Sequence, residues 1–373
     1  MPTPPFRADH VGSLLRPDSV KHARKAHLED GTMSAEELAE VEDDAIRDLI
    51  RMQEDAGLKA VTDGEQRRSF WHYDFMGELT GLDLVEKDVD QGAQFAGIKL
   101  RPVFPTITTK LAFPADHPHL QHFKFVAENT SVVPKISIPG PSCCHFRTAK
   151  ADIHVPEYED IEVLTADIAA TYKDAVQAFY DAGCRYLQMD DIFFAYLCDP
   201  KHRAQKVEDG QDPDWLAQRY AWMMNEAIKD RPDDMVIGMH MCRGNFRSTH
   251  AAEGAYDQVA DVVLNQTGVD IFFMEYDSDR AGGLEPLSFL AKGTQRVLPG
   301  FITTKTAPLE DMDWLKRQFD EASKFADLDQ LGIAPQCGFA STEEGNSITA
   351  DEQRRKLDLV VETAEAIWGG VEA

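Results

Sequence analysis

Cysteine, positive charge and long apolar runs are all scarce in this sequence, and each scarcity excludes a class of protein. Six cysteines in 373 residues are too few for a disulfide-stabilised scaffold. No apolar run reaches the roughly 18 residues of a membrane-spanning helix, and residues 1–16 lack the apolar core of a secretory signal. We therefore expect a cytoplasmic protein with no membrane partner, whose thiols are free for metal binding or catalysis.

The charge balance excludes a second group of partners. Lys and Arg total 38 against 65 Asp and Glu, which gives a formal net charge of −27. Such a surface repels the phosphates of nucleic acids and anionic lipids. Two catalytic motifs are also missing, because Gly282-Gly283 lacks the spacing of a phosphate-binding loop and no Gly-x-Ser-x-Gly elbow occurs. Hydrophobic residues make up 43%, as in an ordinary globular protein.

Short apolar segments alternate with longer segments of helical period, which is typical of repeated βα units. Ser34 directly precedes one helical segment, and Glu37 lies three residues after Ser34. This is the spacing of a capping box. The helical period predicts helices over residues 35–56, 158–182, 215–229, 256–265, 311–326 and 351–369. The apolar segments predict strands over residues 8–13, 59–62, 134–138, 186–189, 235–239, 271–274, 296–301 and 332–335.

Eight strands in this alternation predict a single (β/α)₈ barrel spanning residues 1–373, with an open doubly wound sheet as the competing α/β fold. Residues 77–130 are rich in Pro, Gly and charge and contain a further strand candidate at 103–111. We expect them to form an insertion or cap between the second and third strands. Barrel enzymes carry their catalytic groups just after the strands, at the carboxyl end.

Metal-binding residue types lie at three of these predicted strand ends. In an extended chain the side chains of His240 and Cys242 point to the same side, and Glu275 and Cys337 end two later strands. His, Cys and carboxylate are ligands of Zn²⁺ in tetrahedral sites. The alternative for each is a buried structural role, and Cys143-Cys144 after the third strand is the rival thiol pair.

Two thiolate ligands favour one kind of zinc chemistry. They donate charge to the metal and make it a weaker Lewis acid for water than a site of His and carboxylate ligands. Such a site still deprotonates an incoming thiol. Glu275 is suited to be the ligand that leaves when the substrate sulfur arrives. The ligand set therefore predicts thiol alkylation rather than hydrolysis.

These residues resemble the zinc ligands of the cobalamin-independent methionine synthase family, in its catalytic C-terminal barrel. Three further segments resemble the family's first, second and fourth strands: Arg7-Ala8-Asp9-His10-Val11-Gly12-Ser13, Ala60-Val61-Thr62-Asp63-Gly64-Glu65 and Leu187-Gln188-Met189-Asp190. The wider superfamily also contains uroporphyrinogen decarboxylases and epoxyalkane:coenzyme M transferases.

The resemblance implies a role for each matching residue. It implies that His240, Cys242, Glu275 and Cys337 hold Zn²⁺. It implies that Glu65 and Asp190 bind the homocysteine ammonium, and that Gly12 and Ser13 receive its carboxylate. The activity implied is transfer of a methyl group to homocysteine, through a zinc-bound thiolate, to give methionine. Without the resemblance, helix capping or a buried hydrogen-bond network explains Glu65 and Asp190 equally well.

The methyl donor stays open, because the sequence departs from the family on that side. Full-length members carry two barrels and this chain has length for one. The family's histidine after the seventh strand corresponds to the stretch around Lys305, and its Asp-Glu-Pro is here Asp190-Asp191-Ile192. A folate, a methyl-corrinoid protein and a small methylated metabolite remain as donors. The alternatives to a homocysteine methyltransferase are a zinc enzyme for another thiol, such as coenzyme M, and a non-catalytic metal-binding barrel.

Two further features are candidates for the substrate pocket. Residues 69–75 form an aromatic cluster, Ser-Phe-Trp-His-Tyr-Asp-Phe, that forms either a pocket wall or a hydrophobic seal. Arg243, directly after the expected ligands, either holds an anionic donor or pairs with a local carboxylate. Lys305 and Arg243 are thus weaker candidates for catalytic residues.

Overall fold

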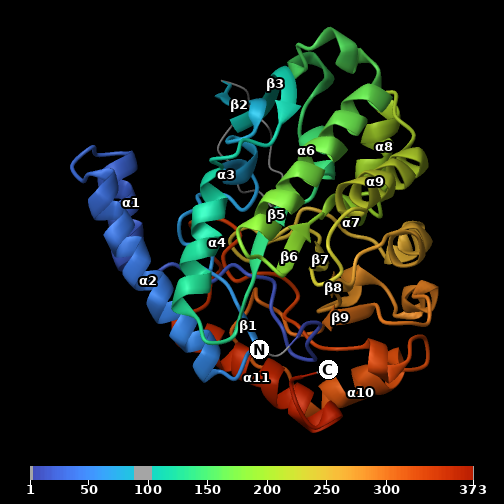
Figure 1. Cartoon of the computed structure of the whole chain (residues 1–373). Coiled ribbons are helices and arrows are strands. Elements are labelled where there is room, and N and C mark those ends of the chain that lie inside the picture. The colour runs from blue at the N-terminus through green and yellow to red at the C-terminus, as the bar shows by residue number, and fades with distance from the viewer. Residues whose placement is uncertain (1–2, 88–102, 373) are drawn as a thin grey trace.

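The computed structural model describes residues 3–87 and 103–372 and arranges parallel strand segments around a closed barrel (Figure 1). Five of the segments form a continuous parallel sheet in the order β5-β6-β7-β8-β9. These strands are buried along nearly their whole length, as expected when helices cover the outside of a parallel sheet. Their bounds are Ile136–Pro139, Tyr186–Asp190, Val236–Met241, Ile271–Glu275 and Arg296–Gly300.

The remaining part of the barrel closes through shorter contacts. β1 (Ala60–Val61) pairs in parallel with β4 (Val133–Pro134), directly before β5. Residues 8–13 and 332–335 are predicted as strands, and the structure pairs them through isolated parallel bridges, Ala8 with Ile333 and Ile302 with Pro335. Gly12 has a φ of 134°, which interrupts the extended geometry of the first segment. The eight predicted segments thus form the predicted barrel. At its seam, where the first and last segments meet, isolated bridges take the place of a continuous strand pairing.

Helices cover the outside of the barrel, and five of the six predicted ones begin and end within four residues of the expected positions. The capping box of Ser34 and Glu37 is present at the start of α2. No helix in the described ranges is long and apolar enough to cross a membrane. The α-helices are α1 Asp18–Leu28, α2 Ala35–Asp55, α3 Tyr73–Met76, α4 Pro118–Asn129, α5 Ser142–Phe146, α6 Ile161–Asp181, α7 Phe193–Tyr196, α8 Pro200–Glu208, α9 Pro213–Ile228, α10 Met312–Ala322 and α11 Ala350–Trp368.

The helix expected over residues 256–265 has a different form. A 3₁₀ turn, Tyr256–Gln258, is followed by a π-helical turn, Asp261–Asn265. In a ten-residue segment the apolar spacing fits i+3, i+4 and i+5 hydrogen bonds about equally, so the sequence pattern alone does not distinguish them.

The segment between the second and third barrel strands contains an antiparallel hairpin and a helix. β2 (Thr80–Glu86) pairs with β3 (Val103–Ala112), which agrees with the strand candidate at 103–111, and α4 follows. Residues 88–102 of the expected insertion lie outside the described residues. The hairpin joins the barrel through β3, where the backbone N–H of Leu111 donates to the Tyr158 hydroxyl at 3.1 Å.

The interior of the barrel holds a buried polar network. Lys135 and Asp9 are fully buried and their Nζ and Oδ1 atoms lie 2.7 Å apart, while the Tyr186 hydroxyl donates to the other Asp9 oxygen at 2.5 Å. Gln188 lies 3.4 Å from Lys135 Nζ, and its amide donates to Asp190 Oδ1 at 2.7 Å. The network therefore runs from the middle of the barrel to the carboxyl end of β6.

Candidate metal centre and substrate pocket

Parallel strands bring their carboxyl ends to one rim, and three predicted ligands meet there. His240 and Cys242 lie at and just after the end of β7, and Cys337 follows the segment at 331–335. Met241, between the first two, is buried in the hydrophobic core, as the alternation of side chains along a strand requires. The ligand atoms of His240, Cys242 and Cys337 all lie within 4.8 Å of one another, and all three residues are buried.

The geometry of this cluster fits a metal ion. The Cys242 and Cys337 sulfurs lie 3.6 Å apart, far beyond disulfide bonding. Two Zn–S bonds of about 2.3 Å at the tetrahedral angle separate their sulfurs by about 3.8 Å. Both ring nitrogens of His240 are buried without a conventional hydrogen-bond partner, and the ring's polar neighbour is the Cys337 sulfur. A buried imidazole directed at two thiols is explained by a shared metal.

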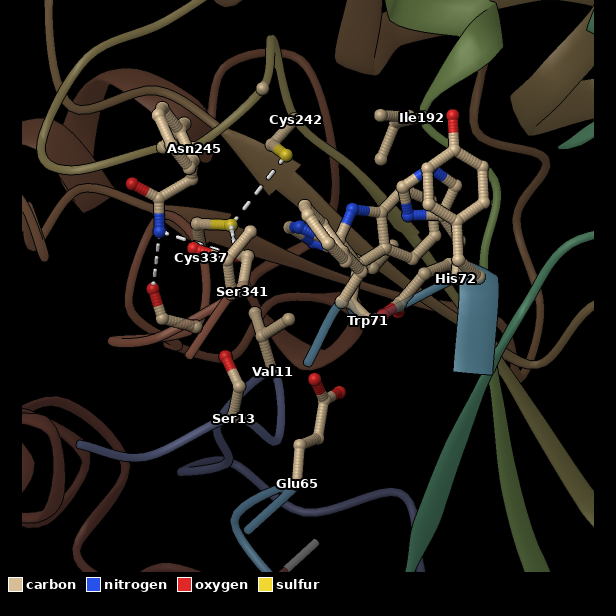
Figure 2. A pocket seen from close by; sticks show the side chains of 18 of the residues that line it. Val11, Ser13, Glu65, Trp71, His72, Ile192, Cys242, Asn245, Cys337 and Ser341 are labelled. Carbon is tan, nitrogen blue, oxygen red and sulfur yellow. Dashed lines mark hydrogen bonds between the residues drawn. The ribbon is translucent and has the colours of Figure 1, made fainter. Parts of the chain in front are cut away.

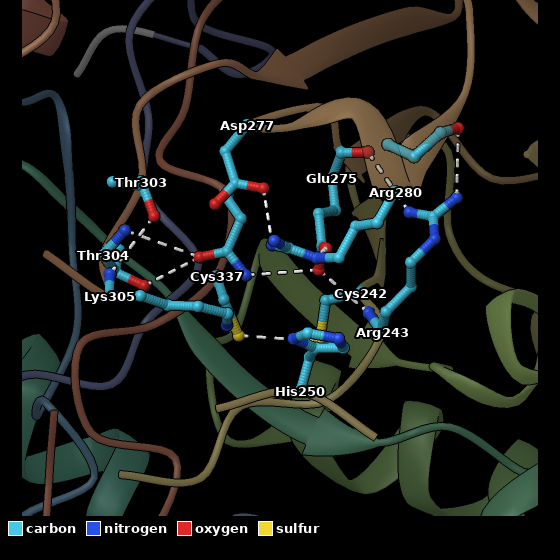
Figure 3. Close-up of polar contacts among 12 residues, drawn as sticks. Cys242, Arg243, His250, Glu275, Asp277, Arg280, Thr303, Thr304, Lys305 and Cys337 are labelled. Carbon is cyan, nitrogen blue, oxygen red and sulfur yellow. Dashed lines mark hydrogen bonds and ion pairs between the residues drawn. The ribbon is translucent and has the colours of Figure 1, made fainter. Parts of the chain in front are cut away.

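Glu275, the fourth predicted ligand, lies beside the cluster but outside the group of three (Figure 3). Its Oε1 accepts from Arg280 at 2.7 Å, and its Oε2 accepts from the Arg243 backbone N–H at 2.9 Å and from Gln336 at 3.2 Å. Burial disfavours its charge, but Lys305, Arg280 and Arg243 outweigh burial and lower the pKa of Glu275 to about 2. The structure therefore holds an ionised carboxylate next to the three ligands.

The cluster opens into a pocket that is lined by residues from several strand ends and loops of the barrel rim. Figure 2 shows Cys242 and Cys337 on one side, Trp71 and His72 facing them, and Ser13 and Glu65 close to one another. The aromatic cluster at residues 69–75 therefore forms a pocket wall. The lining residues are Val11, Ser13, Glu65, Phe70, Trp71, His72, Tyr73, Arg147, Asp190, Ile192, Tyr196, His240, Cys242, Gly244, Asn245, Phe246, Cys337, Gly338, Ser341 and Thr342.

Two buried carboxylates, Glu65 and Asp190, line the same pocket. Glu65 Oε1 accepts from the Ser137 hydroxyl at 2.9 Å and lies 3.3 Å from Arg68 Nη1, whereas its Oε2 is buried without a partner. Burial, assisted by the nearby Asp190 charge, raises the pKa of Glu65 to about 7. Burial also raises the pKa of Asp190 to about 6. Burial thus outweighs the Arg68 charge at Glu65, and the second Glu65 oxygen remains available for a further partner.

The backbone at Glu65 is strained. Its φ of 58° lies in the left-handed region, which a residue other than Gly, Asn or Asp rarely adopts. The Asp63 carboxylate supports this conformation by accepting from the Glu65 N–H at 2.9 Å. Such strain is stored where a side chain must be held in one direction. Here it holds the Glu65 carboxylate at the pocket.

Of the two predicted carboxylate-binding residues, Ser13 lines the pocket and Gly12 lies behind it. The Gly12 carbonyl accepts from the Thr62 hydroxyl at 2.6 Å, which ties the first strand segment to the second. The Ser13 hydroxyl lies close to Gly338, where an added Cβ would be only 1.8 Å from Ser13 Oγ. Only glycine at position 338 leaves Ser13 its place.

The two weaker catalytic candidates, Lys305 and Arg243, do not line the pocket. The Arg243 guanidinium is fully buried and donates to the carbonyls of Gly254, Glu275 and Ala281. Lys305 Nζ lies 3.3 Å from the Gly244 carbonyl and 3.3 Å from Asn245 Oδ1. Both cations therefore brace the loops around the cluster.

Sequence reasoning missed four residues of the site. Gln336 holds Glu275, and Asn245 donates to the Gly338 carbonyl at 2.8 Å, tying the Cys337 loop to the Cys242 loop. Both residues lie close in sequence to predicted ligands, and this was the signal that could have identified them. Arg147 and Tyr196 line the pocket from the helical loops after β5 and β6. No motif marks either of them.

Fold and site together define a (β/α)₈ barrel with a buried His-Cys-Cys group at its carboxyl rim that could hold a metal ion. The chain belongs to the family of cobalamin-independent synthase catalytic domains, whose model matches residues 6–366. This is a family of methyltransferases related to methionine biosynthesis, and its members are zinc-dependent.

Individual relatives agree with this assignment. The chain is 45% identical to the uncharacterized protein YxjH of Bacillus subtilis over 98% of this chain and 95% of that one. It is similar to the structure of a protein from Listeria monocytogenes assigned as a vitamin-B12-independent methionine synthase, with 37% identity, a TM-score of 0.77, and coverage of 98% and 99%. The structure of a B12-independent methionine synthase from Shewanella shares the fold, at 21% identity and a TM-score of 0.70, over 97% and 98% of the two chains.

Proposed function

We propose that the protein transfers a methyl group to the thiol of homocysteine and so forms methionine, with Zn²⁺ held by His240, Cys242 and Cys337. One observation carries the proposal: the His-Cys-Cys cluster and two buried carboxylates, Glu65 and Asp190, face one pocket, and Glu65 Oε2 has no partner there. The cluster is suited to bind a thiol, and the two carboxylates are suited to bind the ammonium group of an amino acid. Homocysteine carries both groups.

Each side chain then has a part in holding the amino acid. The free Oε2 of Glu65 and the carboxylate of Asp190 accept hydrogen bonds from the ammonium, whose positive charge stabilises both buried carboxylates. The Ser13 hydroxyl, which lines the same pocket, donates to the substrate carboxylate. With the ammonium and the carboxylate on the α-carbon both held, the side chain directs its sulfur toward Cys242 and Cys337. Orientation of this kind contributes several kcal/mol to catalysis.

The metal would supply acidity: Zn²⁺ bound by these residues lowers the pKa of the incoming thiol, so that sulfur reacts as a thiolate. The thiolate sulfur forms the new S–CH₃ bond while the donor's bond to the methyl group breaks and the donor keeps that electron pair. Glu275, ionised beside the cluster, is our proposal for the exchangeable ligand. Arg280 and Gln336 keep its carboxylate ready in the absence of substrate. Lys305 positions the loop of Gly244 and Asn245.

Zinc-edge X-ray absorption with and without homocysteine tests the proposal. We expect a resting shell of two sulfurs plus lighter atoms that gains a third sulfur when homocysteine is added. Coenzyme M, a thiol that carries a sulfonate, is the matched control, because Glu65 and Asp190 repel that anion. A third sulfur from coenzyme M alone would favour another thiol as substrate. A shell unchanged by either thiol would identify a structural site, and absence of zinc would refute the proposal.

A further inference from the structure

Three polar side chains line the pocket wall that the proposed amino-acid site leaves unused: Arg147, Tyr196 and His72. No carboxylate in the described ranges forms an ion pair with Arg147, and its Nε is buried without a hydrogen-bond partner. Its guanidinium lies over the Phe193 ring, 5.2 Å from the ring centre. Arginine stays charged at every physiological pH, so this position keeps a cation without an anion.

The neighbours of Arg147 are also without partners. Tyr196 is 3% exposed and its hydroxyl is buried without a hydrogen bond, and His72 is 4% exposed with both ring nitrogens unpaired. Native structures pair the large majority of buried polar atoms, so three such groups in one wall indicate a missing ligand. Tyr196 and Arg147 line the same pocket as His240, Cys242 and Cys337, so a ligand held by this wall faces the cluster.

An aromatic surface lies beside these polar groups. The Trp71 and His72 rings stack with their centres 4.4 Å apart, and the Tyr73 ring is tilted against His72 with the ring centres 3.9 Å apart. Aromatic faces cover apolar or flat parts of ligands. This wall therefore combines a surface for the body of a molecule with a cation and a hydroxyl for an anionic group.

We propose that Arg147, assisted by Tyr196, binds a carboxylate carried by the methyl donor, whose body lies against Trp71, His72 and Tyr73. The inference rests on the proposed function, in which the amino acid fills the side of Glu65, Asp190 and Ser13. With its carboxylate at Arg147, the donor spans Tyr196 and directs its methyl group to the sulfur at the cluster. The carboxylate is not consumed. A folate glutamate and a small methylated onium acid both carry this group.

Two pairs of ligands test which kind of donor supplies the carboxylate. Each pair compares a donor that carries the carboxylate with its uncharged amide. The first is 5-methyltetrahydrofolate and the diamide of its glutamate, and the second is dimethylsulfoniopropionate and its amide. Binding is measured by calorimetry on the zinc-loaded protein without homocysteine, so that no methyl group is transferred during the titration. The wild-type protein should bind the acid of at least one pair at least tenfold more tightly than its amide, as expected for a charge-assisted hydrogen bond.

The variants assign this preference to a residue. Arg147→Gln should abolish it, Arg147→Lys should keep part of it, and Tyr196→Phe should reduce it about threefold. Arg51→Gln removes one positive charge from an exposed position on α2, where Arg51 pairs with Asp48, and should leave the preference unchanged. Because Arg147→Lys keeps the charge, it separates loss of the anion site from a general failure to fold.

Three outcomes would overturn the inference: no acid preference in either pair, a preference that survives Arg147→Gln, or an Arg147→Gln variant that loses homocysteine affinity instead. The third-sulfur signal tests the proposed function separately. A third sulfur without any acid preference refutes only the role of Arg147. An acid preference that depends on Arg147 without a third sulfur refutes only the homocysteine reaction.

Discussion

Replacing Glu65 by Gln tests the amino-acid site most directly, because the two side chains have the same shape and differ in charge. The unpartnered Glu65 Oε2 is the atom available to an ammonium group. A hydrogen bond to a charged group contributes about 1.5–3 kcal/mol. We therefore expect Glu65→Gln to weaken amino-acid binding by about tenfold to about a hundredfold, while zinc content stays unchanged.

The pH dependence of binding gives the same residue a second signature. Burial, with the charges of Asp190 and Asp63, raises the pKa of Glu65 to about 7 against the opposing effects of Arg68 and Ser137. Only the ionised form attracts an ammonium, so affinity should fall as pH falls through 7. For this single group, binding at pH 6 should be about tenfold weaker than at pH 8. Methionine is the suitable ligand, since it keeps the ammonium and has no thiol proton.

The stability of the protein should depend on pH in the opposite direction to its affinity for the amino acid. A carboxyl whose pKa is higher in the folded than in the unfolded state makes the protein less stable as pH rises from about 4.5 to about 7. The rise from 4.5 to about 7 corresponds to at most about 3 kcal/mol. Glu65→Gln should therefore increase the free energy of unfolding at pH 8, and by less at pH 5. Denaturant titrations measure this change.

Calorimetric titration of methionine into wild-type and variant protein between pH 6 and 8 completes the test. The step near pH 7 should disappear in Glu65→Gln. If the variant binds methionine as tightly as the wild type, or keeps the step, then Glu65 does not hold the ammonium and the reasoning fails.

Three further changes probe other parts of the site. Cys337→Ala should remove zinc and thiol methylation together, whereas Cys198→Ala, at a buried thiol outside the cluster, should keep both. Mass spectrometry measures the zinc content, and full zinc in Cys337→Ala would exclude Cys337 as a ligand. Gly338→Ala should displace the Ser13 hydroxyl and weaken methionine binding without loss of zinc, with Gly293→Ala as the control because its Cβ would meet nothing within 4 Å; equal affinity in both would contradict the role of Ser13. Lys135→Met leaves Asp9 as an unpaired buried charge and should cost about 3–5 kcal/mol in denaturant unfolding, much of which Asp9→Asn should restore in the double variant; a loss below about 1 kcal/mol would contradict the pairing.

The sequence was most informative where strand geometry and ligand chemistry coincide. His240, Cys242 and Cys337 were predicted as ligands from the alternation of side chains and the rim of a barrel, and the structure brings their ligand atoms together. The resemblance to a family supplied Glu65 and Asp190, and the sequence alone does not reveal that Glu65 Oε2 is buried without a partner. Whether Glu275 completes the ligand set stays a prediction.

The donor side of the pocket was less predictable. Arg147 and Tyr196 come from short helices after β5 and β6, so no strand register fixes where their side chains point. Local packing against Phe193 and the aromatic wall decides it. The sequence analysis also missed helix α4, for a different reason. Pro and charged residues near its start resemble a loop, although Pro at the first position of a helix is favourable.

The seam of the barrel has a consequence for how the protein is made. Pocket residues run from Val11 to Thr342, and the seam joins residue 8 to residue 333. A ribosome therefore has to release nearly the whole chain before Cys337 can reach His240. If the proposed function holds, a metal captured earlier would be held by fewer ligands, so loading with the correct ion would be one of the last events of synthesis.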